Sequence, residues 1–266
     1  MTNDKTRREW AWLAAAGSAS ALLGGTATAV AQPMPAGGRP PRIAMLVHPD
    51  MIMLDLAAPL TVFSLLQAEI HLVWRDRQPV ATDIGIPVTP TATLDDCPAD
   101  LDVLFVPGGL KGTVALMNDA RVLGFLSDRG ARAGYVTSVC TGSLLLGAAG
   151  LLKGYGATSH WYVRDLLATM GATVRTDRVV TDRNRITGGG ATAGLDFGLT
   201  LAAVLKDEAT ARRIQLVLEY DPQPPFESGS PERAGKPLVA DVLGRRGPLI
   251  AQARERAAQA RTRLSL

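Results

Sequence analysis

Cys140 is the side chain whose type and placement best suit nucleophilic chemistry. It ends a β-branched, apolar run at 135–139, and Thr141 and Gly142 follow it at the start of a helical pattern. A strand that turns directly into a helix presents such a side chain at the carboxyl edge of a parallel sheet, where α/β folds bind ligands. The amino terminus of the helix stabilises a thiolate, so we predict a lowered Cys140 pKa. The alternative is a small buried core residue.

Four further positions could complete a site around this thiol. Asp55 lies inside an apolar run, either as a helix-capping group or as a general acid and base with a raised pKa. Thr141 is either a capping hydroxyl or a proton relay. Gly108 and Gly109 follow an apolar strand, where their N–H groups could bind a developing anion on the substrate. Cys97 precedes a proline in a loop, and we predict a structural role for it and no bridge to Cys140.

The composition is that of a packed globular protein. The 266 residues are 47% hydrophobic and 20% charged, which is unlike a disordered chain and is enough for one large α/β domain. A formal net charge of +3 excludes nucleic-acid binding driven by bulk charge. Two cysteines and three histidines leave no disulfide framework, four-thiolate site or histidine-rich metal centre.

The first residues have the pattern of a targeting peptide. Arg7 and Arg8 precede a weakly apolar stretch rich in Ala and Gly, which ends in the small-x-small sequence 29–31 (AVA). We therefore predict a twin-arginine signal peptide at 1–31, with a periplasmic or secreted product; a cytoplasmic protein with a disordered tail is the alternative. The low Leu and Ile content disfavours a retained membrane span. A Pro/Gly-rich linker at 32–41 leads to a single domain at 42–266 with a C-terminal helical cap.

Apolar runs alternate with amphipathic segments from residue 42 onward. This pattern predicts a three-layer, flavodoxin-like α/β sandwich with a mostly parallel sheet and a cysteine nucleophile elbow. Strands are expected at 43–47, 70–74, 102–106, 135–139 and 157–159, with hairpins within 80–91 and about 182–185. Helices are expected at 58–67, 120–131, 143–149, 162–170, 194–205 and 207–218, with a solvated basic helix after Pro248.

Three glycine-containing segments resemble the ThiJ/PfpI superfamily, which shares its fold with class I glutamine amidotransferases. These segments are 106–109 (VPGG), 137–143 (TSVCTGS) and 187–190 (TGGG). Within that superfamily, several further segments resemble the bacterial isonitrile hydratases. They are 54–56 (LDL) with Pro59, 71–74 (HLVW), 147–152 (GAAGLL), 160–161 (HW), 219–220 (EY) and 224–226 (PPF). The resemblance covers almost all of 42–231, although 48–50 (HPD) departs from the family's aromatic-Pro-Gly at the pocket entrance.

The resemblance implies a lyase that adds water to an isonitrile and gives an N-substituted formamide through a thioimidate. Cys140 would be the nucleophile, Asp55 the acid and base, and Thr141 an assisting hydroxyl, with Gly108, Gly109 and His160 at the pocket. No metal or organic cofactor is needed for this reaction. The partners implied are a small-molecule substrate and a second copy of the chain in a homodimer.

Three other functions remain open at this point. A hydrolase triad would need an acid two positions after the histidine, but 160–162 (HWY) supplies none. The same thiol elbow could detoxify a reactive carbonyl compound. The first half of the chain also resembles the ligand-sensing domain of AraC-type regulators, whose two helix-turn-helix units have no counterpart in this sequence.

Overall fold

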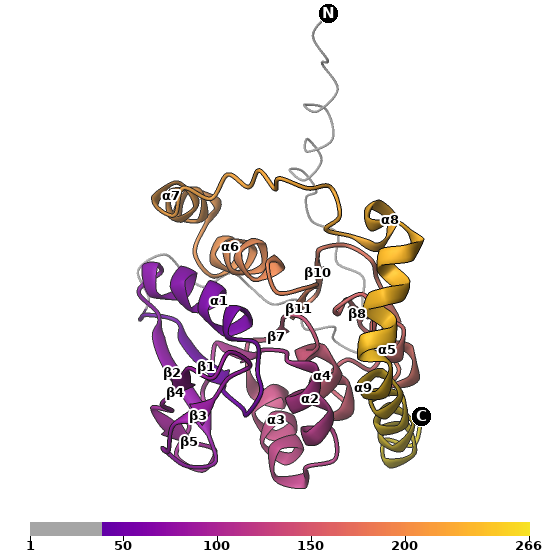
Figure 1. Cartoon of the computed structure of the whole chain (residues 1–266). Coiled ribbons are helices and arrows are strands. Elements are labelled where there is room, and N and C mark those ends of the chain that lie inside the picture. The colour runs from indigo at the N-terminus through magenta and orange to yellow at the C-terminus, as the bar shows by residue number, and fades with distance from the viewer. Residues whose placement is uncertain (1–38) are drawn as a thin grey trace, which may run out of the picture.

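A seven-stranded sheet forms the middle layer of the computed structural model, which describes residues 39–266 (Figure 1). Its strands are β1 (Arg42–Leu46), β2 (Glu69–Trp74), β5 (Ala92–Thr93), β6 (Val103–Val106), β7 (Tyr135–Ser138), β10 (Val179–Asp182) and β11 (Arg185–Gly188). They lie in the order β10-β11-β7-β6-β1-β2-β5, and every neighbouring pair is parallel except β10 with β11. The predicted fold class is confirmed; the predicted signal peptide at 1–31 and most of the linker at 32–41 lie outside the described residues.

Two small sheets lie beside the main one. The first pairs β3 (Val80–Ala81) with β4 (Pro87–Val88) in an antiparallel hairpin, as predicted. The second pairs β8 (Gly156–Ala157) with β9 (Thr173–Val174) in parallel.

Helices cover both faces of the main sheet. On one face lie α1 (Met53–Leu65), α6 (Ala193–Leu205) and α7 (Glu208–Val217). On the other lie α2 (Leu110–Leu116), α3 (Ala120–Arg132), α4 (Gly142–Ala148), α5 (Leu166–Thr169) and the long α9 (Lys236–Arg263), which α8 (Pro231–Ala234) precedes. This arrangement makes the three layers visible in Figure 1.

Three aromatic rings attach the first helical layer to the sheet. Phe63 of α1 and Phe197 of α6 both meet Phe105 of β6, with ring centroids 6.4 and 5.5 Å apart, and all three side chains are fully buried. Aromatic pairs at such separations stabilise a core beyond the area that they bury. The central strands are apolar along their whole length because helices cover both of their faces.

The predicted helix at 58–67 begins earlier in the structure, at Met53. Pro59 therefore lies inside α1 and not in its first turn, and its ring nitrogen cannot donate to the Asp55 carbonyl one turn before it. The early start matters for function, because it places Asp55 in the first turn of α1. Sequence analysis also missed the short helix α2, and the predicted helix at 162–170 is reduced to α5.

The last helix differs most from its prediction. The 28-residue α9 begins at Lys236 and contains Pro248 in its interior, whereas a solvated helix was expected only after that proline. One face of α9 is fully buried at Ala253, Ala257 and Ala260, and it packs on α2, α4 and α5. The small side chains let the helices approach closely, so α9 is part of the domain and not a solvated appendage.

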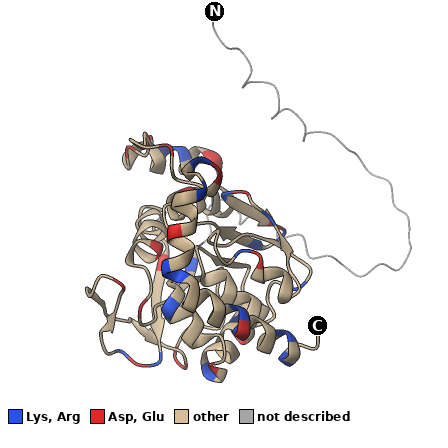
Figure 2. Cartoon of the chain, turned by 45° about the vertical axis from the view of Figure 1, so that its right-hand side comes forward, with Lys and Arg blue, Asp and Glu red and all other residues tan. Residues whose placement is uncertain are grey.

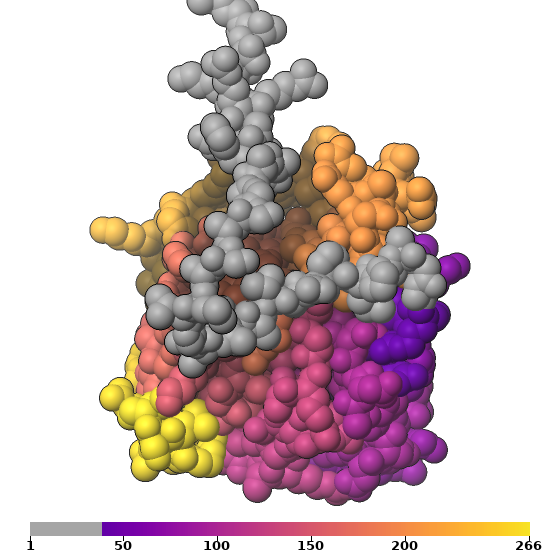
Figure 3. Space-filling view, turned by 180° about the vertical axis from the view of Figure 1, so that it is seen from behind, coloured from indigo at the N-terminus to yellow at the C-terminus, as the bar shows by residue number. Residues whose placement is uncertain are grey.

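The surface of the described residues carries charges of both signs. Basic and acidic side chains are interspersed over the face shown in Figure 2. From behind, the C-terminal residues and the β2–β5 region lie on opposite sides of the molecule (Figure 3). No helix within residues 39–266 combines the length and the apolar character that crossing a membrane requires.

Candidate active site

Cys140 lies at a strained turn between β7 and α4. Its φ of 55° is in the left-handed region, which costs a non-glycine residue on the order of 1 to 3 kcal/mol. Four hydrogen bonds hold the turn: the Cys140 N–H donates to the carbonyls of Gly188 (3.1 Å) and Gly189 (2.6 Å), while its carbonyl accepts from Ser143 Oγ (3.2 Å) and Ser159 Oγ (3.0 Å). The predicted elbow is present, and its sulfur lines a cavity.

The glycines at 108 and 109 bring Asp55 and Thr141 to this elbow. The Gly108 N–H donates to Asp55 Oδ2, and the Gly109 N–H donates to Thr141 Oγ1, both at 2.9 Å. A Cβ on Gly108 would lie 2.7 Å from Asp55 Oδ2 and 2.8 Å from Cys140 Cβ, so only glycine fits there. These N–H groups therefore position two side chains of the site, which differs from the predicted role of binding an anion on the substrate.

Neither the Asp55 carboxylate nor the Thr141 hydroxyl makes a helix-capping hydrogen bond. The N-cap of α1 is Ile52, and the Asp55 carboxylate accepts from Gly108, which is 53 residues away along the chain. Thr141 is the N-cap residue of α4, but its hydroxyl makes no capping hydrogen bond and lies 2.8 Å from Thr113 Oγ1. The capping interpretations are therefore wrong, whereas the proton-relay role of Thr141 stays a prediction.

Burial raises the pKa of both reactive groups. The pKa of Asp55 rises to about 7, because burial outweighs the hydrogen bonds from the Gly108 N–H and the Cys140 thiol. The pKa of Cys140 is raised well above its usual value, first by burial and then by the neighbouring Asp55 carboxylate. The Thr141 N–H at the helix start does lower the Cys140 pKa, as predicted, but by less than burial raises it. The free thiol therefore holds its proton at neutral pH, which corrects the prediction of a thiolate.

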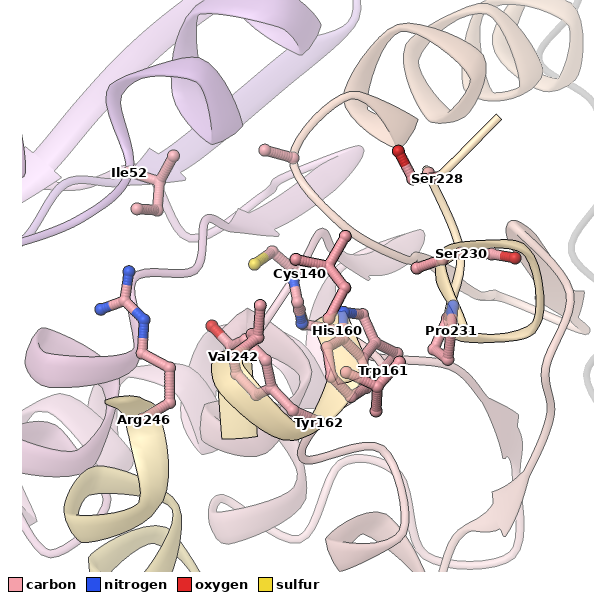
Figure 4. A pocket seen from close by; sticks show the side chains of 15 residues that line it. Ile52, Cys140, His160, Trp161, Tyr162, Ser228, Ser230, Pro231, Val242 and Arg246 are labelled. Atoms are coloured by element: carbon pink, nitrogen blue, oxygen red, sulfur yellow. The ribbon is translucent and has the colours of Figure 1, made fainter. Parts of the chain in front are cut away.

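A cavity of about 380 Å³ opens above the thiol (Figure 4). Ile52 lies on one side, and His160, Trp161 and Tyr162 form an aromatic wall next to Cys140. The third side comes from the C-terminal segment between 228 and 246. It contributes Ser228, Gly229, Ser230, Pro231, Ala234, Leu238, Val239, Val242 and Arg246. Sequence reasoning missed this wall entirely, because the segment carries no motif and reaches the site only through the packing of α9.

His160 lines the cavity as predicted but forms no catalytic triad. Its pKa is lowered to about 4 by burial and by the nearby Arg164 and Arg246, so the ring is neutral. Its buried Nδ1 has no hydrogen-bond partner in the part of the chain that the structure describes. The ring stacks on Tyr162 with centroids 3.8 Å apart. A histidine without an acidic partner is not oriented to act as the base of a hydrolase.

Residues 48–50, where the sequence departs from the family pattern, do not line the cavity. His48 is fully buried, and its ring nitrogens lie 3.0 Å from the Pro49 carbonyl and 3.4 Å from the Pro107 carbonyl. Asp50 pairs with Lys111 at 3.0 Å. Within the loop between β1 and α1, Ile52 is the residue that lines the cavity.

Cys97 and Cys140 are both free and buried, as predicted. The Cys97 thiol lies near the Pro98 carbonyl and Arg129, away from the cavity, which agrees with a structural role. No group of three or more His, Cys, Asp or Glu side chains within residues 39–266 is arranged to hold a metal ion.

Comparison with known proteins agrees with this geometry. Residues 41–204 match the DJ-1/PfpI family. An isonitrile hydratase from Pseudomonas putida is 49% identical over 226 residues, which cover 85% of this chain and 98% of that protein. A crystal structure of a THiJ/PfpI family protein from Pseudomonas syringae is also 49% identical, with a TM-score of 0.81 over 84% of this chain and 97% of that chain.

A second kind of relative shares only part of its length with this chain. The HTH-type transcriptional regulator GbdR of Pseudomonas aeruginosa is 32% identical over 180 residues, and the match covers 47% of that regulator. The family match spans more than half of the chain, and the identity to the hydratase extends over nearly all of that protein. On this evidence the chain belongs to the DJ-1/PfpI family.

Proposed function

We propose that this protein is a lyase of the isonitrile hydratase type, which adds water to an isonitrile and releases an N-substituted formamide. One observation carries the proposal: the Cys140 thiol at the cavity lies beside the buried Asp55 carboxylate, and burial raises the pKa of both groups. The 49% identity to the Pseudomonas putida isonitrile hydratase over nearly its whole length supports the same reaction.

The first step needs one proton and one nucleophile, and this pair holds both. The carbon of an isonitrile R–NC carries a lone pair that accepts a proton, and the protonated carbon is then open to attack by sulfur. Asp55 takes the thiol proton and delivers it to that carbon, while the Cys140 sulfur bonds to the same carbon and gives the thioimidate R–N=CH–S. A carboxylate with a pKa of about 7 can both accept and donate at neutral pH.

The second step regenerates the enzyme. The Asp55 carboxylate removes a proton from water as the oxygen attacks the thioimidate carbon, and it passes that proton to the nitrogen. The carbon–sulfur bond of this adduct then breaks, which releases R–NH–CHO and returns a proton to the Cys140 sulfur. Asp55 Oδ1 has no hydrogen-bond partner among the described residues, so one carboxylate oxygen is free to act while Gly108 holds the other.

The test is formamide release by the purified protein. Incubation with a small set of isonitriles should produce the matching N-substituted formamides, with loss of turnover in Cys140→Ala and retention in Cys97→Ala. Cys97 is an apt control because it is the other buried thiol of the chain and lies outside the cavity. Failure of every isonitrile to react, with hydrolysis of an amide or reaction with an aldehyde in its place, would overturn the proposal.

We also propose export by the twin-arginine route, on the strength of Arg7, Arg8 and the 29–31 sequence. A folded protein would cross the membrane with Cys140 already shielded. The exported form should begin near Gln32 and contain two alkylatable thiols after denaturation without reductant. A cytoplasmic protein that keeps its first residues would contradict this proposal.

A homodimer is the assembly that we propose, from the resemblance to the family. Exposed apolar side chains at Leu216, Val217 and Phe226 support an interface between copies. The mass measured by light scattering should be twice that of the mature chain, and a monomer at micromolar concentration would contradict the proposal.

A further inference from the structure

Arg246 is the only charged side chain that lines the cavity within residues 39–266. It stands on α9 and extends its guanidinium over the cavity toward Ile52 (Figure 4). No ion pair or hydrogen bond satisfies it in that part of the chain, whereas its neighbour Arg245 pairs with Asp241 at 2.9 Å one turn away. The cavity therefore contains a cation whose counter-ion is not supplied by the described residues.

The groups around Arg246 suit an anion. Burial lowers the pKa of His160 and raises that of Tyr162; the positive charge of Arg246 adds to the first shift and opposes the second, so it acts on both rings of the aromatic wall. The Tyr162 hydroxyl points toward the same side of the cavity as the guanidinium (Figure 4). The carboxylate nearest to the thiol, Asp55, is held by Gly108 and does not line the cavity.

The part of the C-terminal wall that α9 contributes before Arg246 is apolar. Leu238, Val239 and Val242 precede Arg246 on the same helix and face the cavity. A molecule that reaches from Cys140 to Arg246 would thus contact aliphatic side chains along its body and a guanidinium at its end. About 380 Å³ is within the range of sites for small organic molecules.

We infer that the preferred substrates are isonitriles whose substituent R has an apolar body and ends in a carboxylate, which Arg246 binds as its counter-ion. This inference rests on the proposed hydratase function and adds a substrate class to it. A guanidinium binds a carboxylate through two parallel hydrogen bonds, and the Tyr162 hydroxyl can donate a third. Arg246 is exposed to solvent, so the preference should depend on salt concentration.

The test compares isocyanoalkanoates of increasing chain length with their methyl esters. The ester keeps the isonitrile and the apolar body and removes only the charge. The wild-type enzyme should give a higher kcat/KM for the carboxylate of the best length. Arg246→Ala should lower that value about tenfold more than it lowers the value for the ester, mostly through KM. Arg246→Lys should restore part of the loss, and Tyr162→Phe should give a smaller loss in the same direction.

Arg245→Ala is the matched control, because it removes the same charge from the adjacent position of α9 but outside the cavity. Arg245→Ala should leave the ratio of kcat/KM between the carboxylate and the ester unchanged. If the preference came only from the net charge of the protein, this variant would lower the ratio as well. A wild-type preference for the ester, or equal losses for both substrates in Arg246→Ala, would overturn the inference while the hydratase function stands. If no isonitrile reacts at all, both the inference and the proposed function fail.

Discussion

The two ends of the cavity differ in polarity and in burial. At the elbow, Cys140, Asp55 and Thr141 are buried: the Cys140 N–H donates to the Gly188 and Gly189 carbonyls, and the Asp55 and Thr141 side chains accept from the Gly108–Gly109 turn. The opposite wall, between 228 and 246, is mostly aliphatic and partly exposed, and it lies beyond the 41–204 segment that matches the family. We therefore expect the reaction to depend on the segment common to the family, and substrate choice to depend on the C-terminal helices.

The largest expected effect follows from removing the nucleophile. Cys140→Ala should lower kcat by about 10⁴-fold or more, because no other thiol reaches the cavity. Steady-state formation of formamide measures this loss, with Cys97→Ala as the matched control. Activity above a few per cent of wild type in Cys140→Ala would show that the elbow sulfur is not the nucleophile.

Asp55→Asn should be nearly as severe. The amide keeps an oxygen for the Gly108 N–H but can neither take the thiol proton nor return it, so we expect a loss of about 10² to 10⁴-fold in kcat. The wild-type rate should change with an apparent pKa near 7, and this change should be absent from the residual activity of Asp55→Asn. An unchanged pH profile in the variant would assign the titration to another group.

The same carboxylate should make the protein less stable at neutral pH. The Asp55 pKa is about 7 in the folded state and about 3.9 in an unfolded chain, so between these values the folded state alone retains the proton. The unfolding free energy therefore falls as the pH rises from about 4 to about 7, by on the order of 3 to 4 kcal/mol at most.

Asp55→Asn removes this titration and tests its sign. From pH 4 to pH 7 the Tm of the variant should rise relative to that of the wild type, by on the order of 10 °C in total. Above pH 7 the difference in Tm should stay constant. Differential scanning calorimetry across this range gives the comparison. A constant difference would mean that the buried carboxylate does not titrate in this window.

The smallest effect concerns the C-terminal wall. Val242→Phe should raise KM for bulky isonitriles by about three- to tenfold and leave kcat for a small isonitrile near that of wild type, because the larger side chain fills cavity space from α9, an element that supplies neither reactive group. Initial rates with a small and a bulky substrate separate these quantities. An equal loss of kcat for both substrates would show that the wall also supports the reaction.

The elbow was predictable because its signals are local. A β-branched strand, a cysteine and a glycine-containing helix occupy adjacent positions, and their order alone places Cys140 at the sheet edge. The direction of its pKa shift was not predictable. That shift depends on how deeply the thiol is buried and on Asp55, which α1 brings from 85 positions earlier in the chain.

The helix boundaries show where local signals mislead. Pro59 was placed in a first turn, and the last helix was expected only after Pro248, yet both prolines lie inside helices that tertiary packing stabilises. The start of α9 at Lys236 and its packing on α2, α4 and α5 then determine which residues face Cys140. No motif in 228–246 records that contact, so the wall and Arg246 could be found only in the structure.

The most direct test of the paired thiol and carboxylate is the covalent intermediate itself. Reaction of the purified enzyme with an isonitrile, quenched in acid within the first turnovers and analysed by peptide mass spectrometry, should show a mass increase equal to the whole isonitrile on the peptide that contains Cys140. Asp55→Asn should form this adduct more slowly, and Cys140→Ala should not form it. Formamide production by an enzyme that never carries the adduct on Cys140 would contradict the account.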